Sequence, residues 1–232
     1  SSSASDVYMI QIFVHGLGSG GDGIARLEDG RVVFIPGALP GDLVRVELAK
    51  VRKKIQYGKI NKVLRSSAQR VTSRCPVVAC GGCVLREFSH QGEIAFKEQR
   101  VHDTLQRIGG IDSQSYSSDF FTSAEEWRYR HRVRLHTRWS GRSWNLGFYE
   151  KGSHNLVNYS GCSVLWPELE KAVSKLAEGI HQLPYQARIK EIRLAYSRKD
   201  KRSAASFEVD GAIEVFRKDL SWLNVSMLGG AE

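Results

Sequence analysis

The chain has 232 residues, 41% of them hydrophobic, which is enough for the cores of one or two domains. Its 34 Lys and Arg residues outnumber 25 Asp and Glu residues, so the net charge is +9 and the pI is about 9.5. This balance predicts a polyanionic partner, with nucleic acid as the first candidate and a membrane surface as the second. No stretch reaches the roughly 18 apolar residues of a membrane-spanning helix, which argues against an integral membrane protein.

The first seven residues carry no signal for export. They begin with three serines and contain neither the basic region nor the apolar stretch of a secretory signal. We therefore expect a cytoplasmic protein. We interpret residues 1–7 as a tag remnant or a disordered tail outside the fold.

Residues 8–64 have the pattern of short strands joined by glycine turns. Strands are expected at residues 11–15, 23–27, 31–35 and 42–48, and the last alternates Val44, Val46 and Leu48 on one face. The Asp29-Gly30 pair between two apolar runs is a strong hairpin signal. Short strands without an intervening helix predict a small antiparallel barrel.

Three glycines in this region, Gly16, Gly18 and Gly21, match the spacing of a dinucleotide-binding loop. Such a loop must open a helix whose N-terminus holds the pyrophosphate. Here the chain runs from residue 22 to 27 and then into the Asp29-Gly30 turn. The context therefore argues against nucleotide binding at these glycines.

All four cysteines of the chain are candidate metal ligands: Cys75, Cys80, Cys83 and Cys162. The first three form a Cys-x4-Cys-x2-Cys group, from which thiolates can converge on one ion or cluster while a distant fourth completes the coordination. Gly81 and Gly82 allow a tight turn that brings backbone N–H groups near sulfur. Disulfides and unrelated buried thiols are the alternatives, but clustered cysteines in a cytosolic chain favour a metal.

A helix is expected after the cysteine loop. Ile94, Val101, Leu105 and Ile108 form one apolar stripe, and Gly109-Gly110 is a natural C-terminal stop. The polar, Ser-rich residues 111–124 then predict a connector between two domains.

The second half begins with a two-residue period. Even positions hold Arg128, Arg130, Arg132, Arg134 and Arg138, whereas odd positions hold Trp127, Tyr129, Val133, Leu135 and Trp139. As a strand, this segment would place an apolar face on a core and a row of guanidinium groups roughly 7 Å apart on the other face. Arginine forks match phosphate oxygens, so the row predicts contact with RNA or DNA. A solvated face with scattered acidic partners is the alternative.

The remaining residues predict a mixed α+β domain. Trp144, Leu146 and Phe148 alternate in a second strand, and further strands are expected at residues 155–159, 191–197 and 204–209. A helix begins at Pro167, with Leu169, Val173, Leu176 and Ile180 facing inward. The apolar residues Val225 to Leu228 are expected to pack on something.

Several motifs of the chain form a linked set. They are GRVVFIPGALPG at residues 30–41, Cys75-Pro76 with CGGC at 80–83, Phe96-Lys97, YRHR at 129–132, GFY at 147–149 with GSH at 152–154, and Cys162 with Val164-Leu165. Together they resemble the uridine-5 RNA methyltransferases that carry an N-terminal TRAM domain and a four-cysteine iron–sulfur cluster, including the 23S ribosomal RNA enzymes. The likeness extends from about residue 8 to about residue 210.

The resemblance implies a mainly β fold with an α+β second half. Residues 8–64 would be an OB-like TRAM barrel that binds RNA, residues 65–110 the cluster loop and helix, and residues 125–232 a central α+β domain that binds RNA, either complete or incomplete. Candidate RNA contacts are Lys53, Lys54, Arg74, Arg128, Arg130, Arg132 and Arg134. The partner would be RNA of ribosomal origin, with no membrane, and the chain is expected to be a monomer.

The resemblance also implies that Cys75, Cys80, Cys83 and Cys162 hold a [4Fe-4S] cluster that serves structure and RNA recognition. The family commonly has five residues between the first two cysteines, whereas this chain has four. Zinc therefore stays open as the alternative metal, because tetrahedral thiolate coordination suits both.

Family members continue into a Rossmann-like domain that binds S-adenosylmethionine and supplies the nucleophilic cysteine, the cofactor loop and the general base. None of these motifs occurs in this sequence, and all four cysteines are assigned to the metal. We therefore name no catalytic residue and expect an RNA-binding portion that does not methylate, with S-adenosylmethionine a cofactor only where the catalytic domain is present. A stand-alone RNA-binding or ribosome-associated module and a redox or iron sensor are the alternatives.

Overall fold

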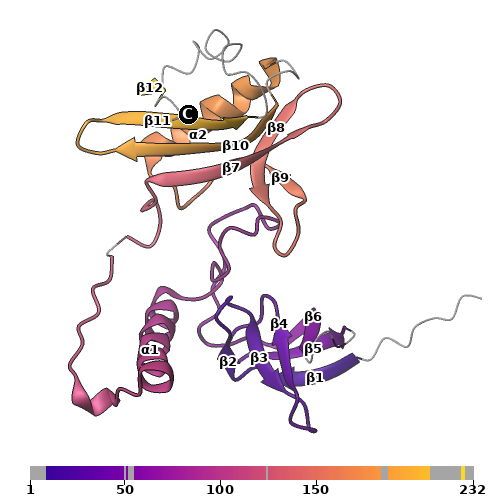
Figure 1. Cartoon of the computed structure of the whole chain (residues 1–232). Helices are drawn as coiled ribbons and strands as arrows, with labels where there is room; N and C mark the ends of the chain where they lie inside the picture. Colours follow the sequence, from indigo (N-terminus) through magenta and orange to yellow (C-terminus); the bar gives the residue numbers. More distant parts are fainter. Residues whose placement is uncertain are drawn as a thin grey trace, which may run out of the picture. The chain divides into compact units, whose positions relative to one another are not determined.

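The computed structural model describes residues 9–49, 51, 55–123, 125–183, 188–209 and 226–227 (Figure 1). Contacts divide the chain into two compact units. The first unit comprises Ser1–Ser73 and Val84–Thr122, and the second comprises Arg74–Cys83 and Ser123–Glu232. The cysteine loop therefore groups with the second unit, whereas the sequence analysis had placed it with the helix that follows. None of the helices that the structure describes is both long and apolar enough to cross a membrane.

The first unit contains a six-stranded sheet among its described residues. Its strands are β1 (Met9–Phe13), β2 (Gly16–Leu17), β3 (Gly23–Arg26), β4 (Val32–Ile35), β5 (Leu43–Leu48) and β6 (Gln56–Arg65). They lie in the order β1-β5-β6-β4-β3-β2, and neighbours pair antiparallel except β4 and β6; the six strands are labelled in Figure 1. The predicted strands are confirmed with ends displaced by one or two residues.

Alternation along these strands builds the first core. Val44 and Val46 of β5 are fully buried, as are Val33 and Ile35 of β4. The predicted Asp29-Gly30 hairpin joins β3 to β4, with Gly30 at φ 84° and the Gly30 N–H donating to the Leu27 carbonyl at 2.9 Å. Positive φ is a conformation that glycine adopts without a steric penalty, which explains this residue at the turn.

The glycines that match a dinucleotide-binding spacing form a β2–β3 hairpin. The Gly18 N–H donates to the Asp22 carbonyl at 2.8 Å, and the Gly21 N–H donates to the Gly18 carbonyl at 3.0 Å. The chain then continues directly into β3. No helix opens at this turn, as the surrounding sequence had indicated.

Helix α1 (His90–Gly109) follows the cysteine loop in sequence. Ser89 caps its N-terminus by accepting the Gly92 N–H, and Gly110 ends it in the left-handed conformation at φ 63°. The predicted glycine stop is confirmed. The apolar stripe is only partly covered within the described residues: Val101 and Ile108 are 45% and 81% exposed, whereas Ile94 and Leu105 are half-buried. A short 3-10 helix, η1 (Ser113–Ser115), lies in the expected connector.

The second unit contains another six-stranded sheet among its described residues. Its strands are β7 (Arg132–Trp139), β8 (Trp144–Tyr149), β9 (Leu156–Asn158), β10 (Ile189–Ser197), β11 (Arg202–Val209) and β12 (Ser226–Met227). They lie in the order β12-β11-β10-β7-β8-β9, and every neighbouring pair is antiparallel except β11 and β12. Of the expected apolar segment at residues 225–228, only residues 226–227 are described.

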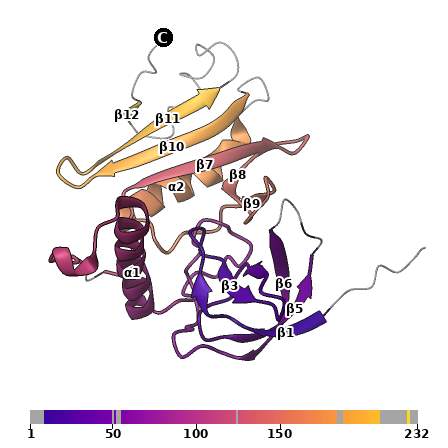
Figure 2. The ribbon, with the colours of Figure 1, turned by 60° about the horizontal axis from the view of Figure 1, so that its bottom comes forward.

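One face of this second sheet carries helix α2 (Pro167–Gly179), which continues into the 3-10 helix η2 (Ile180–Gln182) (Figures 1 and 2). Leu169, Val173 and Leu176 of α2 are fully buried, as the periodicity predicted. They pack in one cluster with Leu135 of β7 and Ile192 of β10. The other face of the sheet therefore carries the polar, alternate residues of the same strands.

Candidate metal centre and nucleic-acid interface

The cysteine loop is held against the β8–β9 hairpin of the second unit. Cys80 forms an isolated antiparallel bridge with Glu150, and the Gly81 N–H donates to the Tyr149 carbonyl at 2.9 Å. Cys162 lies in the same compact unit, after β9. The fold thus brings the three clustered cysteines and the distant fourth into one unit.

Both glycines between Cys80 and Cys83 have a structural role. A Cβ atom on Gly81 would lie 2.6 Å from the backbone nitrogen of Lys151, so only glycine allows this close approach to the hairpin. The Gly82 N–H donates to the Cys80 sulfur at 3.5 Å. A backbone donor directed at sulfur is the arrangement that the Cys-Gly-Gly-Cys sequence predicted.

The thiols are partly buried and influence one another. Burial raises the pKa of Cys83 and of Cys162, and the neighbouring cysteines raise both further. Arg130 acts in the opposite direction and lowers the pKa of Cys83. A bound cation would reverse the effect of burial, because a metal binds the deprotonated thiolate.

The donor set suits an iron–sulfur cluster or zinc, since both take four thiolates. None of the four cysteines forms a disulfide. Across the described residues, however, no three His, Cys, Asp or Glu side chains converge closely enough to hold an ion. The four-cysteine metal site therefore stays a prediction.

The predicted row of five arginines on one strand is wrong in its extent. Strand β7 begins only at Arg132. Before it, Arg130 pairs in parallel with Leu165, and its backbone exchanges hydrogen bonds with Val164 and Trp166. Arg128 has a φ of 57°, which is incompatible with a strand. Only Arg132, Arg134 and Arg138 of the row thus lie on β7.

The face of the second sheet opposite α2 carries a partly neutralised basic surface. Arg134 lies opposite Arg193 of β10, and Glu191 forms an ion pair with each, at Nε–Oε1 distances of 3.2 Å and 2.6 Å. Glu191 is thus an acidic partner of the kind expected if the arginine face were only solvated. The Arg134 and Arg193 side chains are still 61% and 55% exposed, so their guanidinium groups remain accessible to an anion.

Two aromatic rings stack on this face beside the arginines. His136 of β7 and Tyr149 of β8 have ring centroids 3.8 Å apart and planes 8° apart. Burial lowers the pKa of His136, and the nearby Glu191 only partly opposes this effect. Exposed cations and stacked rings on one sheet face suit both parts of a nucleotide, its phosphate and its base.

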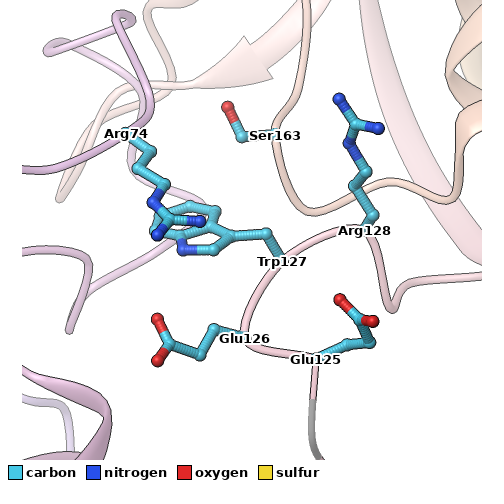
Figure 3. A pocket seen from close by; sticks show the side chains of 6 residues that line it. All are labelled: Arg74, Glu125, Glu126, Trp127, Arg128 and Ser163. Carbon is cyan, nitrogen blue, oxygen red and sulfur yellow. The ribbon is translucent and has the colours of Figure 1, made fainter.

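A depression of about 600 Å³ lies elsewhere in the second unit. Its lining residues are Arg74, Glu125, Glu126, Trp127, Arg128 and Ser163 (Figure 3). The Arg74 guanidinium lies over the Trp127 ring, with its carbon 6.0 Å from the ring centroid. The Arg128 N–H donates to the Ser163 carbonyl at 3.1 Å. The depression is therefore lined by segments that directly adjoin Cys75 and Cys162.

The described candidate RNA contacts are thus distributed over the second unit, with Arg130 at its bridge to Leu165. Arg74 and Arg128 line the depression of Figure 3, whereas Arg132 and Arg134 lie on the open sheet face. Lys53 and Lys54 fall outside the described residues. The sequence analysis missed Glu191, Arg193 and the stacking role of His136 and Tyr149, because pairing between β7, β8 and β10 is not visible in any single stretch of sequence.

Comparison with protein families identifies a domain in the amino-terminal part of the chain. Residues 9–60 match the TRAM domain family, so the strands β1 to β6 include a TRAM domain. The match begins at the first residue of β1 and ends within β6. The predicted TRAM assignment is confirmed for this segment.

The chain is also similar to RNA methyltransferases over most of its length. It is 34% identical over 203 residues to the 23S rRNA (uracil(1939)-C(5))-methyltransferase RlmD of Methylococcus capsulatus, covering 86% of this chain and 44% of that protein. It is 32% identical to an uncharacterized RNA methyltransferase of Clostridium tetani, covering 74% of this chain and 37% of that protein. The chain thus spans less than half the length of these curated relatives.

A solved structure shares the fold. The Pyrococcus abyssi tRNA (uracil-54, C5)-methyltransferase, in complex with S-adenosyl-L-homocysteine, superposes with a TM-score of 0.64 at 20% identity. The superposition covers 94% of this chain and 50% of that one. The part of the resemblance that concerns a TRAM domain and RNA methyltransferase relatives agrees with the sequence comparisons, and the solved structure shows a shared fold.

Proposed function

We propose that this chain is the RNA-binding portion of an S-adenosylmethionine-dependent RNA uridine-5 methyltransferase that acts on ribosomal RNA. The observation that carries the proposal is the combination of a TRAM domain with a second unit whose open sheet face presents exposed arginines beside stacked rings. The identity to a 23S rRNA methyltransferase supports ribosomal RNA as the substrate class.

The four cysteines would hold a [4Fe-4S] cluster, with zinc as the alternative metal. The bridge from Cys80 to Glu150 and the backbone donor of Gly82 support a loop arranged around sulfur. When bound, the cluster would supply a structural link between the cysteine loop and the segment of Cys162. No redox step is required of it.

Residues 1–232 would grip RNA, and methyl transfer would belong to the part of the longer relatives that these residues do not cover. Carbon 5 of uracil becomes nucleophilic only after a thiolate has added to carbon 6. With its four thiols assigned to the metal, this chain has none left for that addition. The target base must also leave its stack, which requires the flanking RNA to be held in place.

A methylation assay tests the proposed division of labour. The purified chain is incubated with S-adenosylmethionine and ribosomal RNA, and the RNA is digested and analysed for 5-methyluridine. We expect binding of the RNA without formation of 5-methyluridine. Formation of the modified nucleoside above a no-protein control would contradict the proposal that the chain is inactive.

A further inference from the structure

We propose that the depression of Figure 3 binds one unpaired RNA nucleotide whose base carries an exocyclic amino group. This inference rests on the proposed RNA-binding function and adds a site and a base preference to it. The depression measures about 600 Å³ and presents an aromatic ring, two guanidinium groups, a hydroxyl and two carboxylates. These are the groups that stack a base, hold a phosphate and accept from a base edge.

Trp127 supplies the stacking surface. Its indole ring lines the depression, and the Arg74 guanidinium lies over it at 6.0 Å. Proteins that bind unpaired RNA stack bases on aromatic rings and on guanidinium planes alike. Two stacked layers need more than this 6.0 Å separation, so a base that enters here would stack on the indole once the Arg74 guanidinium has moved outward.

Arg128 and Ser163 supply the phosphate end. In Figure 3 both side chains lie toward one end of the depression, away from Glu125 and Glu126. Arg128 holds a φ of 57°, a conformation that costs free energy for any residue other than glycine. Its N–H bond to the Ser163 carbonyl fixes that conformation. The backbone thus orients a phosphate-binding side chain into the depression at a cost in stability.

Glu125 and Glu126 supply the base preference. A carboxylate accepts hydrogen bonds, so it pairs with the exocyclic amino group of cytosine, adenine or guanine. Uracil has no exocyclic amino group: its one donor at that edge, the N3–H, lies between two carbonyl oxygens that would face the carboxylates with acceptors. The depression is therefore suited to a nucleotide beside a target uridine and not to the uridine itself.

Fluorescence anisotropy tests this site by measuring how tightly the full chain binds short single-stranded RNA oligomers. The wild-type chain should bind oligocytidine several-fold more tightly than oligouridine. Trp127→Ala should weaken oligocytidine binding about tenfold, because stacking contributes substantially for each base. Trp127→Phe should retain most of the affinity, since a ring remains. The double variant E125Q/E126Q should remove the preference for cytidine over uridine.

Phe121→Ala is the matched control, because this aromatic side chain is 97% exposed and does not line the depression. It should bind both oligomers as the wild type does. Unchanged oligocytidine binding by Trp127→Ala, with the salt dependence of wild type, would overturn the nucleotide site and leave RNA binding intact. A wild-type chain that binds neither oligomer would overturn the proposed function as well. Equal loss by the Phe and Ala variants would also contradict stacking.

Discussion

A buried ion pair stabilises the first unit at the level of single residues. Asp42 is fully buried, and Arg70 donates to its carboxylate from Nη2 at 2.5 Å and from Nε at 3.3 Å. The carboxylate also accepts from the backbone N–H groups of Leu39 and Ser67. Burial alone would raise the pKa of Asp42, but these hydrogen bonds outweigh it and hold the pKa below its ordinary value.

Arg70→Met should destabilise the first unit by about 3–5 kcal/mol, because it leaves a buried carboxylate without its cation. Urea denaturation monitored by far-ultraviolet circular dichroism measures this loss in the free energy of unfolding. Arg31→Met is the control, since the Arg31–Asp29 pair is exposed and its removal should leave stability almost unchanged. Equal stabilities of the two variants would contradict the structural role of the Asp42–Arg70 pair.

The same pair predicts how stability depends on pH. Because the pKa of Asp42 is lowered on folding, its contribution to stability is fully present above the unfolded value of about 4. That contribution is lost as the pH falls through the lower folded pKa. In Arg70→Met the folded pKa should rise, so the difference in stability from wild type should shrink as the solution is acidified.

At the level of elements, a glycine of β8 lets strand β9 pair closely with it. A Cβ atom on Gly147 would lie 1.9 Å from the Val157 carbonyl oxygen, which no side-chain movement can relieve. The same hairpin carries the contacts of Cys80 and Gly81 with residues 149–151. Pairing of β8 with β9 therefore positions the cysteine loop.

Gly147→Ala should disrupt the β8–β9 pairing and destabilise the second unit by about 1–3 kcal/mol or more. Thermal unfolding gives the size of the loss, and amide exchange of Tyr159, whose N–H donates to the Leu146 carbonyl, locates it. Gly16→Ala is the control, because a Cβ atom there meets nothing within 4 Å. If the Tyr159 amide of Gly147→Ala exchanged at the wild-type rate, the close approach of β9 to Gly147 would be unimportant for their pairing.

Periodicity predicted most elements but misjudged the start of β7. The arginines alternate from residue 128, which predicts a strand from that position, but in the structure β7 begins at Arg132. Residue 130 instead pairs with Leu165, some 35 positions away, and no local pattern reports such a partner. By contrast, the stop of α1 at Gly110 and the hairpin at Asp29-Gly30 depend on local backbone conformation, and the sequence predicted both.

At the level of the whole molecule, the sequence predicted the TRAM domain and the arginines of β7 but not the residues that β10 adds to the same sheet face. The spacing of the cysteines and the family resemblance grouped Cys75 with Cys162, and both lie in one compact unit. Glu191 and Arg193 were missed because they oppose β7 from a strand more than 50 residues later. A distant strand partner becomes visible only once the register is known.

The proposed metal site predicts the composition of the purified chain. After anaerobic purification, the wild type should contain iron and acid-labile sulfide and absorb broadly in the visible range. Cys162→Ser should lose most of both, because three thiolates then remain. Stoichiometric zinc without sulfide would select the alternative metal, whereas wild type free of either metal would contradict the four-cysteine site.

The dependence of RNA affinity on salt tests the central claim, that this chain grips RNA through its basic sheet face. The double variant R132Q/R134Q should reduce the slope of log affinity against log salt by about 1.4, since each lost phosphate contact removes about 0.7 for single strands. The variant K171Q/K175Q removes the same charge from α2, on the opposite face of the sheet, and should keep the slope of wild type. An unchanged slope and affinity in R132Q/R134Q would contradict the account.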